Sequence, residues 1–234
     1  MNYNIRGFME VSFLDWVGAV CSIIFLPDCN FRCPYCHNAE LVLHPNKLPS
    51  IPEAHVFARL RKQKKWIEGV VVTGGEPTLS PALPDLLRSL KRYGLKVKLD
   101  TNGSRPDVLS ELTGEKLIDY AVMDVKAPLE QAKMDAVTGV GAPLNSIAES
   151  IEFVRACGLP HQFRTTFCPK FLTFEDLDQI GEAIRGADVW TIQNFKNKDT
   201  LDPSLANLEP IDGEELLALR PRLEQFVKRL QIIS

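Results

Sequence analysis

Short runs of apolar and β-branched residues recur along the chain, and each is followed by a segment with the spacing of an amphipathic helix. Strands that alternate with helices are typical of a parallel sheet with right-handed crossovers. The predicted strands are Val20–Leu26, Gly69–Thr73, Leu95–Thr101, Tyr120–Val125, Gln162–Phe167 and Val189–Asn194. The predicted helices lie near 52–66, 81–93, 106–116, 144–157, 174–186 and 213–231. We therefore expect an α/β fold, open or barrel-like, forming a single domain over residues 1–234 with its core at about 20–195.

Composition and charge narrow the possible functions. Apolar residues make up 45% of the 234 positions, which suffices for a full core and argues against disorder. The formal net charge of −3 argues against nucleic acid or an acidic membrane as the main partner. No apolar run is long enough to span a membrane, and the start lacks a secretory pattern. Six cysteines are too few for a disulfide scaffold, so we expect a reduced, cytoplasmic protein whose clustered thiols bind a ligand.

Polar and thiol side chains follow nearly every predicted strand. In parallel α/β folds the ligand binds at the carboxyl ends of the strands, so these residues are the candidate site. In chain order they are Cys29, Cys33 and Cys36; Gly74, Gly75, Glu76 and Pro77; Asp100, Thr101, Asn102 and Gly103; Asp124 and Lys126; and Gln193 and Asn194.

The three cysteines after the first strand have C-x₃-C-x₂-C spacing. A thioredoxin-like dithiol at Cys33 and Cys36 leaves Cys29 without a role, and c-type haem attachment at Cys33-x-x-Cys36-His37 normally needs an exported protein. A structural zinc site usually pairs two separated ligand groups, and no second group follows. A [4Fe–4S] cluster takes four ligands when fully protein-bound, so three thiolates leave one iron open to a substrate. The pattern favours this last interpretation, and the other cysteines, Cys21, Cys157 and Cys168, are interpreted as small buried residues.

With Tyr35 directly before the last cysteine, this motif resembles that of the radical S-adenosylmethionine (SAM) enzymes, and the resemblance extends from about Cys21 to Asn194. It implies a partial (β/α)₆ barrel with one [4Fe–4S] cluster held by the three cysteines. SAM would bind the open iron, with Gly74–Pro77 on its amino group and Tyr35 near its adenine. An electron from the reduced cluster would then cleave SAM into methionine and a 5′-deoxyadenosyl radical that abstracts hydrogen from a substrate.

A larger set of motifs points to a narrower family within these enzymes. Cys36-His37-Asn38, Asp100-Thr101-Asn102-Gly103 and Asp124-Val125-Lys126 look like those of the glycyl-radical-enzyme activases. That family includes pyruvate formate-lyase activating enzyme and the activating proteins of anaerobic ribonucleoside-triphosphate reductase. Residues 37–73 contain no cysteine, so the ferredoxin-like inserts of some activases are not expected here.

The activase resemblance also implies roles for single residues. A monovalent cation would lie near Asp100, Thr101 and Asp124, whose hard oxygen donors suit such an ion. The residues implied to contact SAM are Asn38, Asp100, Asn102, Lys126, Arg164 and Gln193. Instead of binding a cation, Asp100, Thr101 and Asp124 could cap the helices that follow their strands. Instead of contacting SAM, Arg164 could form a structural ion pair. At Gln193 the formate-lyase activase has a histidine nearby, so this sequence departs from the pattern there.

These patterns predict an oxidoreductase that installs a glycyl radical on a partner, foremost an anaerobic ribonucleotide reductase. The alternatives are an activase of the pyruvate formate-lyase type and a radical SAM enzyme acting on a small molecule such as a deazaguanine precursor. A non-catalytic zinc or ferredoxin-like module would leave Gly74–Pro77 unexplained. Flavodoxin or ferredoxin is the expected reductant, and the basic run Arg59–Lys65 is either its docking site or a solvated helix face.

Overall fold

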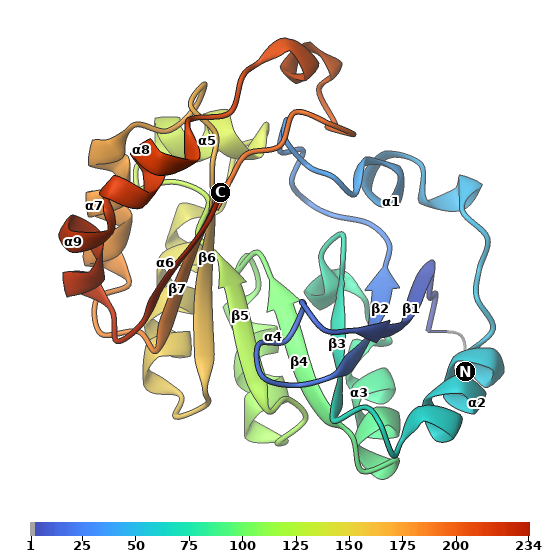
Figure 1. Ribbon diagram of the computed structural model, residues 1–234. Coiled ribbons are helices and arrows are strands. Elements are labelled where there is room, and N and C mark those ends of the chain that lie inside the picture. Colours follow the sequence, from blue (N-terminus) through green and yellow to red (C-terminus); the bar gives the residue numbers. More distant parts are fainter. Residues whose placement is uncertain (1–2) are drawn as a thin grey trace. The chain divides into compact units, whose positions relative to one another are not determined.

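The computed structural model describes residues 3–234, in which strands and helices alternate along most of the chain (Figure 1). The strands are β1 Gly7–Ser12, β2 Cys21–Leu26, β3 Gly69–Gly74, β4 Lys96–Thr101, β5 Tyr120–Asp124, β6 His161–Phe167, β7 Val189–Asn194 and β8 Leu230–Ile233. The α-helices are α1 Ala39–Leu43, α2 Glu53–Gln63, α3 Leu83–Arg92, α4 Pro106–Gly114, α5 Gln131–Thr138, α6 Leu144–Ala156, α7 Phe174–Ala183, α8 Gly213–Ala218 and α9 Arg220–Leu223. Short 3₁₀ helices form at Pro45–Lys47, Pro77–Leu79, Pro203–Asn207 and Glu224–Phe226. The predicted α/β fold class is confirmed, with the six predicted strands as β2 to β7.

The chain forms two compact units. The first comprises Met1–Asn30, Glu40–Thr101 and Asp107–Ala121. The second comprises Phe31–Ala39, Asn102–Pro106 and Val122–Ser234.

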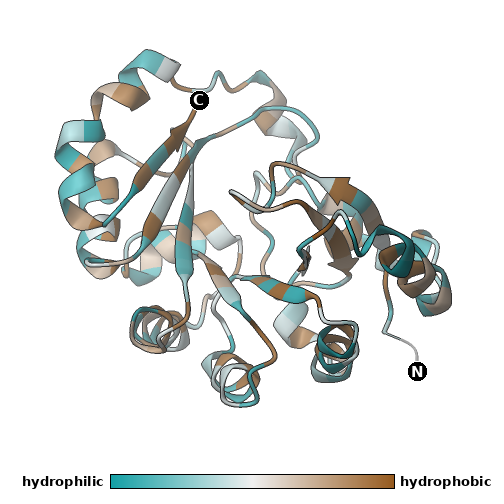
Figure 2. Cartoon of the chain, turned by 60° about the horizontal axis from the view of Figure 1, so that its bottom comes forward, coloured by the Kyte–Doolittle hydropathy of each residue, from teal (hydrophilic) through white to brown (hydrophobic). Residues whose placement is uncertain are grey.

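In the first unit, β1 is antiparallel to β2, whereas β2, β3 and β4 pair in parallel. The register places Leu26 beside Gly74, so the carboxyl ends of β2 and β3 are neighbours. Helix α3 buries Leu83, Leu86, Leu87 and Leu90, whose spacing places them on one helix face. Figure 2 shows helices that carry teal and brown residues side by side, as expected when one face is buried.

In the second unit, β6, β7 and β8 pair in parallel, and Phe167 lies beside Asn194 at the ends of β6 and β7. Trp190 on β7 is fully buried, and its Nε1 donates a hydrogen bond of 3.1 Å to the hydroxyl of Thr165. Helix α7 begins with a capping box formed by Thr173 and Asp176.

The predicted helix at 213–231 is wrong. This stretch forms α8, α9 and a 3₁₀ turn, and it ends in strand β8, which pairs with β7. Pro221 is tolerated in the first turn of α9 but cannot continue a helix from α8. Ile232 and Ile233 are β-branched, and the edge of β7 supplies their backbone partners. Strand β1 and helices α1 and α5 also lie outside the predicted elements.

Within residues 3–234 no helix combines the length and the apolar character needed to cross a membrane.

Candidate functional site

The loop after β2 carries the three cysteines, and backbone hydrogen bonds fix its first residues. The N–H of Gly75 donates to the carbonyl of Leu26 at 2.9 Å, and the N–H of Glu76 donates to that of Asp28 at 2.7 Å. Asp28 in turn donates its N–H to Leu41 at 3.0 Å. Asp28 has a left-handed backbone with φ of 65°, which Asp adopts more readily than most residues. The carboxyl end of β3 therefore holds the residue directly before Cys29.

Gly74 and Gly75 allow this close approach. A Cβ atom on Gly75 would lie 1.9 Å from the carbonyl oxygen of Asp28, and one on Gly74 would lie 2.1 Å from that of Leu26. The φ of Gly74 is also 129°, which L side chains rarely adopt. Both positions thus require glycine for packing against the cysteine loop, a contact that the sequence pattern alone did not predict.

Glu76 joins the ends of β3 and β4. Its side chain is 1% exposed, and its Oε1 accepts hydrogen bonds from the N–H of Thr78 at 3.1 Å and the hydroxyl of Thr78 at 2.5 Å. The hydroxyl of Thr101 donates to the same oxygen at 2.7 Å. Pro77 is buried at the start of the 3₁₀ turn that presents Thr78. Within the first unit, Glu76 and Thr101 therefore form one buried hydrogen-bonded group.

Asp100, also on β4, has a cationic neighbour that the sequence analysis missed. The Nζ of Lys98 lies 3.2 Å from Oδ1 of Asp100 and donates to the carbonyl of Asp15 at 2.5 Å. Lys98 is only 4% exposed, and a buried ammonium needs such partners. The signal was available, because residues two apart on a strand share a face.

Asn102 begins a tight turn in the second unit. Its Oδ1 accepts from the N–H of Ser104 at 2.9 Å, and Gly103 follows with φ of 75°. A Cβ on Gly103 would lie 2.1 Å from Cε of Met123. Asn102 is therefore buried in a side-chain-stabilised turn that precedes α4.

The second half of the cysteine loop is anchored within the second unit. The N–H of Arg32 donates to the carbonyl of Thr138 at 2.7 Å, and the N–H of Cys36 donates to that of Cys33 at 2.9 Å. Farther along, Asp202 donates its N–H to the carbonyl of Pro34 at 2.8 Å.

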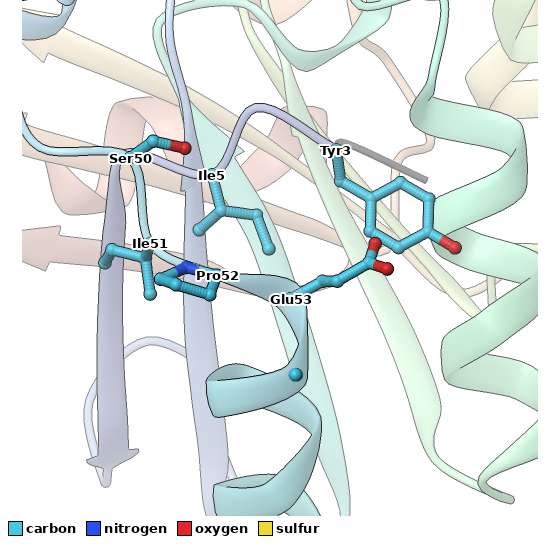
Figure 3. A pocket seen from close by; sticks show the side chains of 7 residues that line it. Tyr3, Ile5, Ser50, Ile51, Pro52 and Glu53 are labelled. Carbon is cyan, nitrogen blue, oxygen red and sulfur yellow. The ribbon is translucent and has the colours of Figure 1, made fainter.

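Two cavities differ in their relation to this loop. One of about 470 Å³ in the second unit is lined by His37, Lys196, Asn197, Lys198, Asp199 and Pro210. Nδ1 of His37 lies 3.0 Å from the carbonyl oxygen of Lys198. The other, of about 380 Å³ in the first unit, is lined by Tyr3, Ile5 and residues 50–54, and Figure 3 shows the carboxylate of Glu53 beside the ring of Tyr3. None of the predicted site residues lines that second cavity.

The donor chemistry of the loop suits an iron–sulfur cluster. All three cysteines are unbridged thiols, the soft ligands that such clusters take. Across residues 3–234, no three Cys, His, Asp or Glu side chains are gathered closely enough to hold a metal ion. The residues nevertheless fit the cluster by chemistry, because each thiolate would bind a different iron and the three need not converge on a single ion. Burial raises the pKa of the Cys33 thiol, which favours its neutral form until a metal replaces the proton.

The other cysteines agree with their interpretation as small buried residues, with Cys157 only half-buried. Cys21 and Cys168 are fully buried. Burial, with a further contribution from Asp15, raises the pKa of Cys21 to about 11.

Tyr35 is buried, and its ring centroid lies 6.3 Å from that of Phe171. Its hydroxyl has no hydrogen-bond partner among the described residues. A buried hydroxyl without a partner is costly, so a ligand that supplied one would gain binding energy here.

Asp124 organises the end of β5 in the second unit. Its Oδ1 accepts from Nε of Arg164 at 2.8 Å, and its Oδ2 lies 3.3 Å from Nζ of Lys126. Burial raises the pKa of Asp124, but Arg164 and Lys126 outweigh it and lower the pKa to about 2. The structural ion pair considered for Arg164 is therefore present, and both oxygens of Asp124 face positive charges.

The remaining candidates lie at element ends. Gln193 is half-buried at the carboxyl end of β7, beside Ile233 in the register with β8. Its neighbour Asn194 donates from Nδ2 to the carbonyl of Ile211 at 2.7 Å. Asn38 is half-buried directly before α1.

Comparison with known proteins identifies the family. Residues 23–184 match the model of the radical SAM superfamily, and the chain belongs to that superfamily. Membership makes the protein an enzyme that uses a [4Fe–4S] cluster and SAM, consistent with the thiol donor set described above.

Several relatives align over much of the chain. A Methanocaldococcus jannaschii protein named "Putative glycyl-radical enzyme activating enzyme" is 31% identical over 99% of this chain and 96% of its own length. Pyruvate formate-lyase-activating enzyme of Clostridium pasteurianum is 24% identical over 97% of this chain and 98% of its own. A "Probable GTP 3′,8-cyclase" of Sulfurisphaera tokodaii is 30% identical over 87% of this chain, but only 60% of its own length is covered.

Among solved structures, Streptococcus suis SuiB bound to its precursor peptide SuiA aligns with a TM-score of 0.68 and 15% identity. The alignment covers 89% of this chain and 48% of SuiB, and it supports the shared fold alone.

Proposed function

We propose that this protein is an activating enzyme that uses SAM and a [4Fe–4S] cluster to generate a glycyl radical on a partner enzyme. The observation that carries the proposal is the cysteine loop, whose backbone at Leu26 and Asp28 is held against Gly75 and Glu76. The alignment along nearly the full length of a relative named as an activating enzyme supports the same reaction class.

The proposal assigns the cluster to three ligands and SAM to the residues at the strand ends. The cluster ligands are Cys29, Cys33 and Cys36. The proposed SAM contacts are Tyr35, Asn38, Gly74, Gly75, Glu76, Pro77, Asp100, Asn102, Lys126, Arg164 and Gln193. When bound, the cluster supplies the electron that cleaves SAM, and the fragment that carries the radical takes a hydrogen atom from the partner's glycine.

The protein's own side chains contribute binding and orientation. Asp124 orients the side chains of Arg164 and Lys126, two cationic groups suited to the carboxylate of SAM. The buried hydroxyl of Tyr35 is available to a polar group of the ligand. We also propose a monovalent cation at Asp100, Thr101 and Asp124. To bind it, the oxygens of these residues would have to give up some of the hydrogen bonds and ion pairs described above.

We infer that the partner is an anaerobic ribonucleotide reductase and that a flavodoxin or ferredoxin supplies the electron. Such carriers are acidic, so their docking would favour a positively charged surface close to the cysteine loop. The exposed Lys196 and Lys198, which share a cavity with His37, provide such a surface in the second unit.

Electron paramagnetic resonance (EPR) spectroscopy of the anaerobically reconstituted, reduced protein tests the proposal. We expect a [4Fe–4S]⁺ signal that changes when SAM is added. Addition of the reductase should then give the doublet of a glycine-centred radical on the reductase chain. A Cys33→Ala variant, which lacks one proposed ligand, is expected to give neither signal.

The other outcomes separate the alternatives. A radical on a formate-lyase partner but not on the reductase would change the partner and keep the reaction. Turnover of a free metabolite, with no radical on either partner, would reject the activase. A cluster spectrum that SAM does not alter would contradict the proposed SAM site.

A further inference from the structure

The turn that ends helix α5 lies against the cysteine loop in the second unit. The carbonyl of Thr138, the last residue of α5, accepts the N–H of Arg32 at 2.7 Å. Arg32 directly precedes Cys33. The end of α5 therefore contacts the loop one residue from a proposed cluster ligand.

Gly139 makes this contact possible. It has a left-handed backbone with φ of 69°, and its N–H donates to the carbonyl of Asp135 at 2.9 Å, which closes the helix. A Cβ on Gly139 would lie 2.4 Å from the carbonyl oxygen of Arg32 and 3.1 Å from its carbonyl carbon. The obstacle is backbone, so it cannot rotate away as the tip of a long side chain would, and the loop would have to move.

The helix end is a firm support for the loop. Thr138 is fully buried, and its hydroxyl lies 2.8 Å from the carbonyl oxygen of Met134 and 3.1 Å from that of Val140. Met134 and Val137 are buried on the same helix. Arg32 itself is half-buried and lies in a loop, whereas the end of α5 is held by packed side chains and helical hydrogen bonds, so we expect the loop to move when this contact is crowded.

We propose that the Thr138–Gly139 turn is a positioning element for the iron–sulfur cluster, because it sets the backbone of Arg32 and thereby the place of Cys33. This inference rests on the proposed role of Cys33 as a cluster ligand. It adds a support in the second unit to the one that Gly75 and Glu76 provide in the first. The sequence pattern does not predict this contact, because a glycine after a helix is expected simply to end the helix.

The test compares Gly139→Ala with Gly158→Ala after anaerobic reconstitution. Gly158 has a similar left-handed φ of 79°, but nothing lies within 4 Å of a Cβ at that position. Both variants thus carry the same kind of backbone strain, and only Gly139→Ala meets the loop. We expect iron and sulfide per chain to fall severalfold in Gly139→Ala and to stay at the wild-type level in Gly158→Ala, without SAM or any partner present.

A third variant separates strain from contact. Asn tolerates a left-handed backbone but carries a Cβ, so Gly139→Asn is expected to fold like the wild type and still to lose cluster content. Circular dichroism and thermal melting of the cluster-free chains check the fold of each variant.

Wild-type loading in Gly139→Asn, or equal loading of Gly139→Ala and Gly158→Ala, would overturn the positioning role. If the wild type itself binds no cluster, the proposed function fails instead. The two failures are therefore distinguishable by the wild-type control.

Discussion

At the scale of single residues, Asp124 shows how one carboxylate can prepare a site. Its two oxygens face Arg164 and Lys126, which hold its pKa at about 2 although burial opposes its ionisation. The unfolded chain has no such partners, so its Asp pKa is near 4. The ionised form is consequently favoured by folding, and Asp124 stabilises the folded state only while it is charged.

We expect Asp124→Asn to destabilise the cluster-free protein by about 2 kcal/mol at neutral pH, since a shift of nearly two pKa units is of that order. The folded-state pKa is depressed, so this stability is present above roughly pH 4 and is lost as the pH falls from about 4 towards 2. Urea unfolding of wild type and variant from pH 7 to pH 3 measures the difference. A gap that stays constant over this range would show that the charge of Asp124 is not its source.

Glu76 illustrates a different use of a buried carboxylate. Three donors, two from Thr78 and one from Thr101, converge on its Oε1. A buried acceptor with several donors is held in one position, which gives a ligand a fixed surface. The residue is therefore both a tie between β3 and β4 and a proposed contact of SAM.

At the scale of elements, the packing of α7 depends on a glycine inside the helix. Gly181 faces Phe226 of the 3₁₀ turn Glu224–Phe226, and a Cβ there would lie 2.5 Å from Cδ2 of the ring. Phe226 is buried, and the guanidinium of Arg185 lies 4.8 Å from its ring centroid. A helix residue with poor intrinsic propensity is thus used because a neighbouring element needs its space.

We predict that Gly181→Ala destabilises the second unit by about 1–3 kcal/mol, because overpacking outweighs the gain of about 1 kcal/mol in helix propensity. Gly114→Ala, at the end of α4 with nothing within 4 Å of its Cβ, is the matched control and should be neutral or slightly stabilising. Urea unfolding compares the two variants, and a further Phe226→Leu change should recover part of the loss. A stabilised Gly181→Ala protein would contradict the packing argument.

At the scale of the whole molecule, the length of the parallel strands separates the basic run from Cys29, the first cysteine of the loop, and both lie in the first unit. Lys64 and Lys65 come shortly before the amino end of β3, and the cysteine loop leaves β2 at the neighbouring carboxyl end (Figure 1). Six residues of extended strand span roughly 20 Å. Part of the run is also used within the first unit, since Arg59 pairs with Glu10 at 2.6 Å and Arg61 contacts Tyr93.

Because electron transfer slows steeply with distance, we expect the triple change Lys62→Glu, Lys64→Glu, Lys65→Glu to leave cluster reduction unchanged. The exposed pair Lys196 and Lys198 lies in the second unit around the cavity that His37 lines. Lys196→Glu with Lys198→Glu should slow reduction by an acidic carrier severalfold and weaken its salt dependence. Stopped-flow spectroscopy measures the rate of cluster reduction in variants with equal cluster content. If the triple change slowed reduction more than the double change, the reductant would dock on the basic run.

Much of the architecture follows from local pattern. The predicted strands appear as β2 to β7. In β2 and β3 consecutive apolar residues suit strands buried on both faces, whereas β6 alternates between buried and half-buried residues. The C-terminal segment cannot be predicted from local pattern in this way. Leu230–Ile233 forms β8 because it pairs with the backbone of β7, which is a tertiary contact. For this reason the helix predicted at 213–231 was wrong, although Gly213–Ala218 and Arg220–Leu223 are helical.

The sequence by itself determined the alternation of strands and helices, the three thiols after the first parallel strand, and the polar groups at the other strand ends. These are properties of residue type and short spacing, and they suffice to indicate the reaction class. Only the tertiary structure decided which groups meet: Gly75 with Asp28, Gly139 with Arg32, and Asp124 with Arg164. Such contacts join segments far apart in the chain, and their geometry depends on sheet register and backbone approach, which no local pattern encodes.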